Sequence, residues 1–160
     1  MSYGDSRVTD KTDRRILELL QANARISNAD LAEQVNLSPT PCLRRVRRLE
    51  EQGVIKQYVA ELDREKIGLH ISAFVFIQLE RNSLENGAAF EQAVKELEEV
   101  MDCFVLTGEH DYLLRVVSED LSSYEKFVKE KLAGIPQVAK IDTTIILNQV
   151  MSRSRLPIPR

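Results

Sequence analysis

The spacing of apolar residues predicts two short helices near the start of the chain. The apolar side of the first helix consists of Ile16, Leu17, Leu19 and Leu20, which recur at helical spacing. Ser27 begins the second helix as its N-cap, and Asp30 three residues further on makes a variant of the capping box. Asn36 ends this helix, because asparagine tolerates the left-handed backbone conformation that a sharp turn can require.

A third helix is predicted over residues 39–52. Ser38 suits the N-cap, and Pro39 suits the first helical position because its missing N–H would have no helical partner there. Gly53 supplies the stop. One side of this helix carries the apolar residues Leu43, Val46 and Leu49. The opposite side carries Thr40, Pro41, Arg44 and Arg48, with Arg45 and Arg47 beside them. Two helices joined by a tight turn to a third with a basic face form a helix-turn-helix unit.

After this helix the pattern changes to alternation and short apolar runs. Residues 54–60 are predicted to form a strand at the start of a wing. The other predicted strands span residues 72–79, 103–107, 112–117 and 138–147. Helices are predicted over residues 88–99, after a loop at 82–87, and from the cap at Asp120 to the stop at Gly134 and Pro136. Strand, helix and strand thus occur twice in succession, which is the ferredoxin-like βαββαβ arrangement.

The fold class that follows is α+β, with an N-terminal winged helix-turn-helix domain before a ferredoxin-like domain. The expected boundaries are 1–60 for the first domain, 61–70 for a linker, 71–150 for the second domain and 151–160 for a tail. Both helices of the second domain should cover one face of its sheet. Because the other face would carry apolar side chains, we expect at least a homodimer. The apolar residues behind this expectation are Phe74, Phe76, Val105, Leu113 and Val117.

Positive charge is concentrated on one helix. The chain has a net charge of −3, and residues 1–63 carry ten basic and ten acidic side chains. Between Ser38 and Leu49, however, there are four arginines and no acid. A merely solvated helix face usually mixes charges of both signs, because like charges repel one another. The local patch therefore predicts docking on nucleic acid at one groove.

The composition argues against several other classes of protein. Cys42 and Cys103 stand far apart and no CxxC or His-rich spacing occurs, so we expect neither a disulfide framework nor a metal site. An apolar leader and a membrane-length apolar run are both missing, which predicts a soluble cytoplasmic protein without membrane contact. Since His70 and His110 have no catalytic companions and no Gly-rich phosphate loop occurs, we expect no enzyme activity and no cofactor.

Several motifs, in their order and spacing, closely resemble those of the Lrp/AsnC (leucine-responsive, or feast/famine) transcriptional regulators. The resemblance covers about residues 10–150. It rests on Asp-Lys-Thr-Asp at 10–13, Arg-Ile-Ser at 25–27, Ser-Pro-Thr-Pro-Cys-Leu at 38–43, Arg-Arg-Leu-Glu at 47–50 and Gly-Glu-His-Asp-Tyr at 108–112. Several members carry an acidic residue where this chain has Arg44, which leaves the operator sequence open.

The resemblance implies a function. Members of the family bind double-stranded DNA through the N-terminal domain, assemble as dimers and larger rings, and sense amino acids. The effector is held between C-terminal domains of neighbouring subunits, near the turn that here contains Gly108, Asp111 and Tyr112. We therefore expect a homodimer that forms a tetramer or octamer. An apolar effector such as leucine is favoured, because the strands near the turn are apolar. The alternative is an architectural protein that wraps DNA without an effector.

The predicted DNA-contact residues are Ser38, Thr40, Pro41, Arg44, Arg45, Arg47 and Arg48. The first turns of a recognition helix approach base edges, which assigns Thr40, Pro41 and Arg44 to the bases and the other arginines to phosphates. Ser38 has two competing roles, helix capping and DNA contact. Loss of the Arg48 side chain is expected to weaken binding to every DNA sequence.

The predicted effector-binding residues are Leu106, Thr107, Gly108, Asp111, Tyr112 and Ile145. Backbone N–H groups around Thr107 and Gly108 are expected to bind a carboxylate, and Asp111 an ammonium group, while the other three side chains form walls. A plain hairpin loop is the competing interpretation of this turn. We expect His110 to be a solvated turn residue and Cys42 to be a small buried apolar residue.

Overall fold

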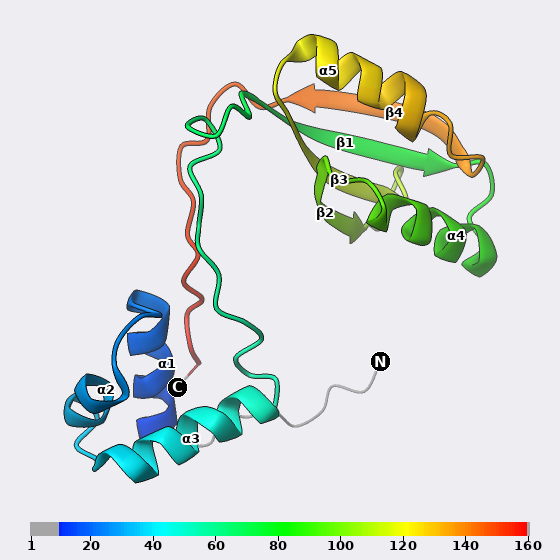
Figure 1. The fold of residues 1–160 in the computed structure, drawn as a ribbon. Coiled ribbons are helices and arrows are strands. Elements are labelled where there is room, and N and C mark those ends of the chain that lie inside the picture. Colours follow the sequence, from blue (N-terminus) through cyan, green and yellow to red (C-terminus); the bar gives the residue numbers. More distant parts are fainter. Residues whose placement is uncertain (1–9, 160) are drawn as a thin grey trace. The chain divides into compact units, whose positions relative to one another are not determined.

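The structure is a computed structural model that describes residues 10–159 (Figure 1). Within these residues the chain divides into two compact units. The first combines residues 10–61 with residues 151–159, and the second spans Leu62–Val150. Among the helices of residues 10–159, none has both the length and the apolar character needed to cross a membrane.

The first unit is built on three helices, α1 (Lys11–Ala22), α2 (Asn28–Gln34) and α3 (Pro39–Glu51). Its buried core consists of Ile16, Leu17, Leu31, Ala32, Cys42 and Leu49. Cys42 is fully buried, which confirms the prediction of a small core residue, and this burial raises the pKa of its thiol. Asn36 in the turn between α2 and α3 has a φ of 55°, so the left-handed conformation predicted for it is also confirmed.

The strand predicted over residues 54–60 is wrong. After Gly53, at a φ of 69°, the backbone N–H groups of Val54 and Ile55 both donate to the carbonyl oxygen of Leu49, at 3.0 and 3.1 Å. These bonds close the end of α3 and turn both side chains toward the helical core, against which they pack. Residues 56–60 then continue without strand structure. An apolar run indicates burial. A strand also needs a neighbouring strand with which to form hydrogen bonds, and the sequence pattern does not reveal whether one is present.

The tail of the chain packs onto the first unit. The side chain of Gln21 in α1 accepts from the backbone N–H of Leu156 at 2.6 Å and donates to its carbonyl oxygen at 3.1 Å. Ile158 packs against the helical core. A hollow of ≈ 750 Å³ lies between the end of α1, residues 54–59 and residues 154–159. The tail, for which the sequence indicated no role, is therefore part of the helical unit.

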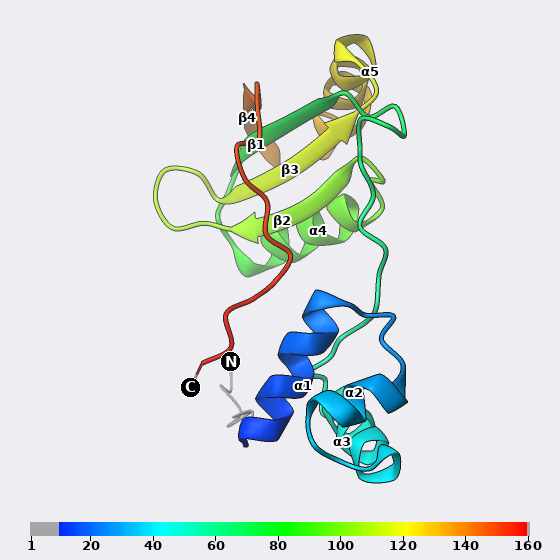
Figure 2. The same ribbon diagram turned by 90° about the vertical axis from the view of Figure 1, so that its left-hand side faces the viewer.

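The second unit is a four-stranded sheet with the order β2-β3-β1-β4, which can be followed in Figure 2. All neighbouring strands are antiparallel. Its strands are β1 (Ile71–Leu79), β2 (Val100–Val105), β3 (Tyr112–Ser118) and β4 (Val138–Ile145). Its helices are α4 (Leu84–Lys95) and α5 (Leu121–Lys126), and α5 continues as a π-helical turn, η1 (Phe127–Leu132). Together with the helices of the first unit, this arrangement confirms the predicted α+β, ferredoxin-like class.

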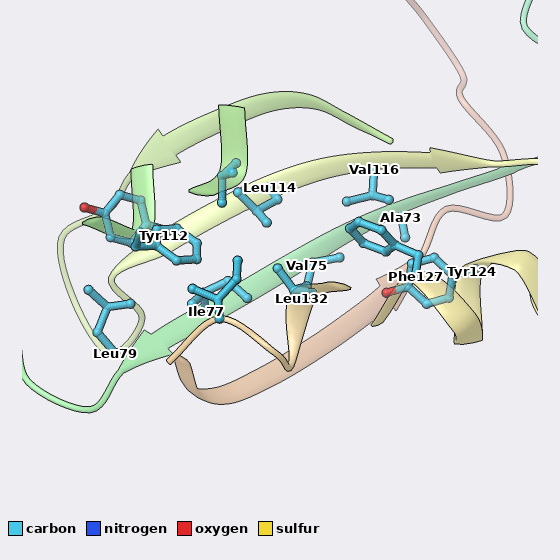
Figure 3. Close-up of a cluster of buried hydrophobic side chains, with 13 residues drawn as sticks. Ala73, Val75, Ile77, Leu79, Tyr112, Leu114, Val116, Tyr124, Phe127 and Leu132 are labelled. Carbon is cyan, nitrogen blue, oxygen red and sulfur yellow. The ribbon is translucent and has the colours of Figure 1, made fainter. Parts of the chain in front are cut away.

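One face of the sheet forms the core of this unit. Side chains of alternate residues, such as Val75, Ile77 and Leu114, point toward the helices and pack against them (Figure 3). The helices contribute Phe90, Val94, Tyr124, Phe127 and Leu132 to the same cluster. Both helices therefore cover a single face, as the alternation of the strands predicted.

Helix α4 begins earlier than the sequence predicted. The loop predicted over residues 82–87 is wrong, because the Ser83 hydroxyl caps the helix by accepting from the backbone N–H of Asn86 at 3.2 Å. Gly87 lies within this helix and not in a loop. A Cβ at Gly87 would stand 2.9 Å from the hydroxyl oxygen of Tyr112, so the glycine makes room for a tyrosine of the sheet.

Candidate functional site

Helix α3 presents an exposed basic face. Arg44 and Arg47 are exposed, and within residues 10–159 neither forms an ion pair. Ser38 and Thr40 are also exposed at the start of the helix, and Pro41 is half-buried. These side chains come from one end and one side of a single helix. They offer two hydroxyl groups and two guanidinium groups to an external anion.

The other two arginines of α3 are engaged with α1. Arg45 donates through Nη1 to Asp10 at 2.5 Å and to Asp13 at 2.8 Å. Arg48 donates through Nη2 to the second carboxylate oxygen of Asp13. The hydrogen bond from Arg45 holds the pKa of the Asp10 carboxyl below its usual value. The sequence pattern predicted all four arginines as DNA-contact residues. It did not show the acidic partners of Arg45 and Arg48, because Asp10 and Asp13 lie 32 to 35 residues earlier in the chain.

Ser38 is the N-cap residue of α3 by position, yet its hydroxyl makes no capping hydrogen bond. In each of the other four α-helices the cap side chain accepts from the backbone N–H of the third helical residue. The third residue of α3 is Pro41, which has no N–H. The hydroxyl of Ser38 is therefore left for another partner, which favours the second of its two predicted roles.

The turn between β2 and β3 is a hairpin loop closed by Asp111. The N–H of Leu106 donates to the carbonyl oxygen of Asp111 at 2.8 Å, while Thr107 and Gly108 are exposed at the tip. Gly108 has a φ of 114°, a conformation that favours glycine. The exposed tip is thus closed at its base by a backbone hydrogen bond.

Both carboxylate oxygens of Asp111 already have donors within the chain. Oδ2 accepts from the backbone N–H of Leu79 at 2.8 Å, and Oδ1 accepts from the side-chain amide of Asn82 at 2.7 Å. These bonds tie the turn to the end of β1. Asp111 therefore has a structural role that the sequence did not indicate, and Asn82 is a partner that sequence analysis missed.

Tyr112 lies under α4 and not at the open turn. Its hydroxyl donates to Glu91 at 2.9 Å, and its ring lies 4.7 Å from that of Phe90. Burial, together with the hydrogen bond to Glu91, raises the pKa of Tyr112 to about 12. Glu91 was not among the predicted site residues, since nothing in the sequence connects it with the turn.

The structure does not bring Ile145 to the turn within one chain. Ile145 pairs with Ala73 on β1, whereas Tyr112 pairs with Ile77, four residues further along the strand. At about 3.3 Å per residue, the two positions lie roughly 13 Å apart along β1. Of the six predicted effector residues, only the neighbours along the sequence therefore lie together within this chain.

The sheet face opposite the helices is not covered by them, and it carries apolar side chains beside an ion pair between Arg115 and Asp102. The strand register places Phe74, Phe76, Leu113 and Val117 on this face. Val105, predicted to join them, is paired with Tyr112 on the helix side, and Phe104 takes its place on the uncovered face. The residues Phe74 and Phe104 are 36% and 50% exposed. The prediction for Val105 is wrong because the register of an edge strand is not visible in its composition.

His110 is not the solvated turn residue that was predicted. Its Nε2 lies 3.0 Å from a carboxylate oxygen of Asp142 on β4, and its ring centroid lies 5.1 Å from that of Phe76. Only 24% of its side chain is exposed. His110 therefore leans over the edge of the uncovered sheet face.

Comparisons with known proteins match both units. The family model of the Lrp/AsnC ligand binding domain matches residues 72–156, and that of a winged helix-turn-helix DNA-binding domain matches residues 9–56. The Bkd operon transcriptional regulator of Pseudomonas aeruginosa is 44% identical over 93% of this chain and 97% of its own. The leucine-responsive regulatory protein of Escherichia coli K12 is 42% identical over 93% and 91%, respectively.

Solved structures agree with the sequence matches. A transcriptional regulator of Neisseria meningitidis, solved in complex with L-methionine, is similar with a TM-score of 0.87 and 38% identity. The similarity covers 92% of this chain and 96% of that one. The chain therefore belongs to the Lrp/AsnC family of transcriptional regulators, with a helix-turn-helix DNA-binding domain followed by the family's ligand-binding domain.

Proposed function

We propose that this chain regulates transcription by binding double-stranded DNA through α3, and that a small apolar amino acid modulates its assembly or DNA affinity. The observation that supports the DNA-binding part is the exposed start and basic side of α3. Both matched domains are binding domains. We therefore assign the chain no catalytic step.

The residues at the start of α3 are those we assign to base edges. The hydroxyls of Ser38 and Thr40 can donate to a base or to a phosphate oxygen. The guanidinium of Arg44 is exposed and can fork onto O6 and N7 of a guanine, a contact that discriminates by about 1–3 kcal/mol. Arg47, which is also exposed, is assigned to the phosphate backbone.

The assignment of Arg47 is tested by Arg47→Ala. Probes are a duplex selected from a random pool by the wild-type protein and a mixed-sequence duplex of equal length. Loss of one phosphate contact should weaken binding to both duplexes and reduce the salt slope by about one unit. Arg155→Ala in the exposed tail is the matched control for charge. An unchanged slope for Arg47→Ala would remove Arg47 from the interface.

The proposed response to a ligand is supported by the second unit, which matches a ligand-binding domain, and by relatives of this chain. One relative is named for its response to leucine, and another was solved with L-methionine. Both ligands are apolar amino acids. We propose that the exposed turn at Thr107 and Gly108 contributes backbone N–H donors for the carboxylate of such a ligand, while Leu106, whose own N–H is bonded to Asp111, forms part of a wall. Since Ile145 lies elsewhere in the subunit, a wall from that residue requires a neighbouring subunit.

A thermal-shift panel of the twenty amino acids tests this proposal. A ligand at about 100 times its dissociation constant should stabilise the folded state by roughly 2.7 kcal/mol. A shift confined to apolar amino acids is the expected result. No shift with any amino acid at millimolar concentration would contradict it, and would favour an architectural protein that wraps DNA without an effector.

We also propose that the uncovered sheet face is where two copies of the chain meet. The face carries Phe74, Phe76, Phe104 and Leu113, of which Phe74 and Phe104 are exposed, and exposed apolar surface of this kind marks interaction sites. A self-complementary contact of this kind gives a dimer, and dimers of this chain are proposed to assemble further into a tetramer or octamer.

A further inference from the structure

The acids that engage α3 form a compact arrangement at the start of α1. The carboxylate of Asp13 is 1% exposed, and each of its oxygens accepts from a different guanidinium, those of Arg45 and Arg48. These arginines are three residues apart, so one carboxylate spans a turn of the neighbouring helix. Asp10 accepts the capping hydrogen bond from the N–H of Asp13 at 2.8 Å and also accepts from Arg45.

We propose that Asp13, supported by Asp10, determines DNA specificity by holding Arg45 and Arg48 away from the phosphate backbone. This inference rests on the proposed binding of DNA by α3. It leaves Arg44 and Arg47 as the arginines of α3 that are available to DNA.

Because Asp13 is buried, breaking its ion pairs with Arg45 and Arg48 is energetically costly. A buried carboxylate must be paired, because an unpaired charge away from water is strongly unfavourable. If Arg45 and Arg48 both turned toward phosphates, Asp13 would lose its partners. The two guanidinium groups are therefore held in place although 45% of the Arg48 side chain is exposed.

The effect on binding follows from charge. Four arginines and two carboxylates leave a net charge of +2 on this surface, by subtraction of two from four. Non-specific affinity comes almost entirely from phosphate contacts, whereas specific affinity also uses base edges. Removing two arginines from the phosphate contacts therefore lowers non-specific affinity by a larger factor than it lowers specific affinity. The ratio of specific to non-specific affinity rises as a result.

The experiment uses Asp10→Asn in the full-length chain. Asparagine is as good an N-cap as aspartate, so this change removes the charge and keeps the helix start. Glu18→Gln is the matched control, because Glu18 lies on α1 and pairs with Arg15 and not with α3. Affinity is measured from 50 to 200 mM salt on a duplex selected by the wild type from a random pool, and on a mixed-sequence duplex.

Asp10→Asn should bind the mixed-sequence duplex more tightly than the wild type and lower the specificity ratio. Its salt slope should steepen by about one unit, which is about fourfold more affinity lost between 50 and 200 mM salt. Glu18→Gln should show neither change. Asp13→Asn should steepen the slope further, and circular dichroism establishes that this variant is folded.

The outcomes separate this inference from the proposed function. If the wild type binds neither duplex, the assignment of DNA binding to α3 fails. If the wild type binds and both Asp variants match Glu18→Gln in slope and ratio, DNA binding stands and the role of Asp13 is overturned. Weaker binding of Asp10→Asn to both duplexes would also overturn it, since the acids would then present the arginines to phosphates.

Discussion

At the scale of single residues, the start of α3 lacks the backbone N–H group to which its N-cap side chain would bond. That side chain, the hydroxyl of Ser38, therefore makes no capping hydrogen bond. Pro39 and Pro41 each lack an N–H, and they occupy the first and third positions of the helix. The start of α3 is therefore poorer in donors than any other helix start in the described chain. The Ser38 hydroxyl, which would cap an ordinary helix, makes no capping bond here, and this supports its proposed contact with DNA.

Pro41→Ala should stabilise the protein and weaken its binding to DNA. The new N–H at the third position lets the Ser38 hydroxyl cap the helix, a bond worth about 1 kcal/mol. Urea unfolding measures the gain, and filter binding measures the loss of affinity. In a Ser38→Ala background the same substitution should bring no such gain. A gain of equal size in both backgrounds would show that capping is not its cause.

Tyr112 provides a prediction for alkaline pH. The pKa of its hydroxyl is raised to about 12, so its neutral form is favoured in the folded state. Its contribution to stability is full below the usual tyrosine pKa of about 10 and is lost as pH rises toward 12. Tyr112→Phe should therefore lose less stability between pH 10 and 12 than the wild type. Chemical denaturation at several pH values measures this difference, and parallel loss in both proteins would contradict it.

At the scale of elements, the apolar pattern predicted the four strands of the sheet. It was wrong for two other segments, the strand predicted over residues 54–60 and the loop predicted over residues 82–87. The strands around Val75 and Leu114 alternate over most of their length between buried and less buried residues, because one face packs against the helices. Residues 54–60 also contain several apolar and β-branched residues, but they have no neighbouring strand to pair with. Gly87 was assigned to a loop, whereas it lies within α4 and leaves space for the hydroxyl of Tyr112.

The candidate site was predictable only where it is local in sequence. The exposed side of α3 follows from spacing within one helix, so Arg44 and Arg47 were placed correctly on its outside. The pairing of Arg45 with Asp10 joins residues 35 apart, and it depends on how two helices pack. The partners of Asp111 likewise come from β1 and from the loop after it. Local periodicity does not reveal contacts of this kind, because the partners are far apart in the sequence.

The tail is an element whose role can be measured directly. Ile158→Ala should destabilise the first unit by about 1–2 kcal/mol, less than the cost for a fully buried isoleucine. Leu156→Ala is the matched control, because its side chain is 75% exposed and only its backbone bonds Gln21. Hydrogen exchange of the α1 amides reports on this unit alone. Equal exchange in both variants would show that the Ile158 side chain contributes nothing to the core.

At the scale of the whole molecule, the uncovered sheet face sets the expected assembly. Phe74→Asp places a charge on this face, opposite the helix-covered core, and should shift dimer dissociation to at least tenfold higher concentration. Sedimentation velocity measures the change. Leu84→Asp is the control, since Leu84 is 96% exposed at the start of α4, where an acid suits the helix dipole. A dimer unaffected by Phe74→Asp would place the contact elsewhere.

The return of the tail to α1 has a consequence for how the protein is made. The DNA-binding unit is assembled from both ends of the described chain, with Leu62–Val150 between them. A ribosome synthesises residues 151–159 only after the whole ligand-binding unit. The contacts of Ile158 and Leu156 with α1 therefore form last, when the sheet domain has already emerged. In a nascent chain the ligand-binding unit can be complete while the DNA-binding unit still lacks its final contacts.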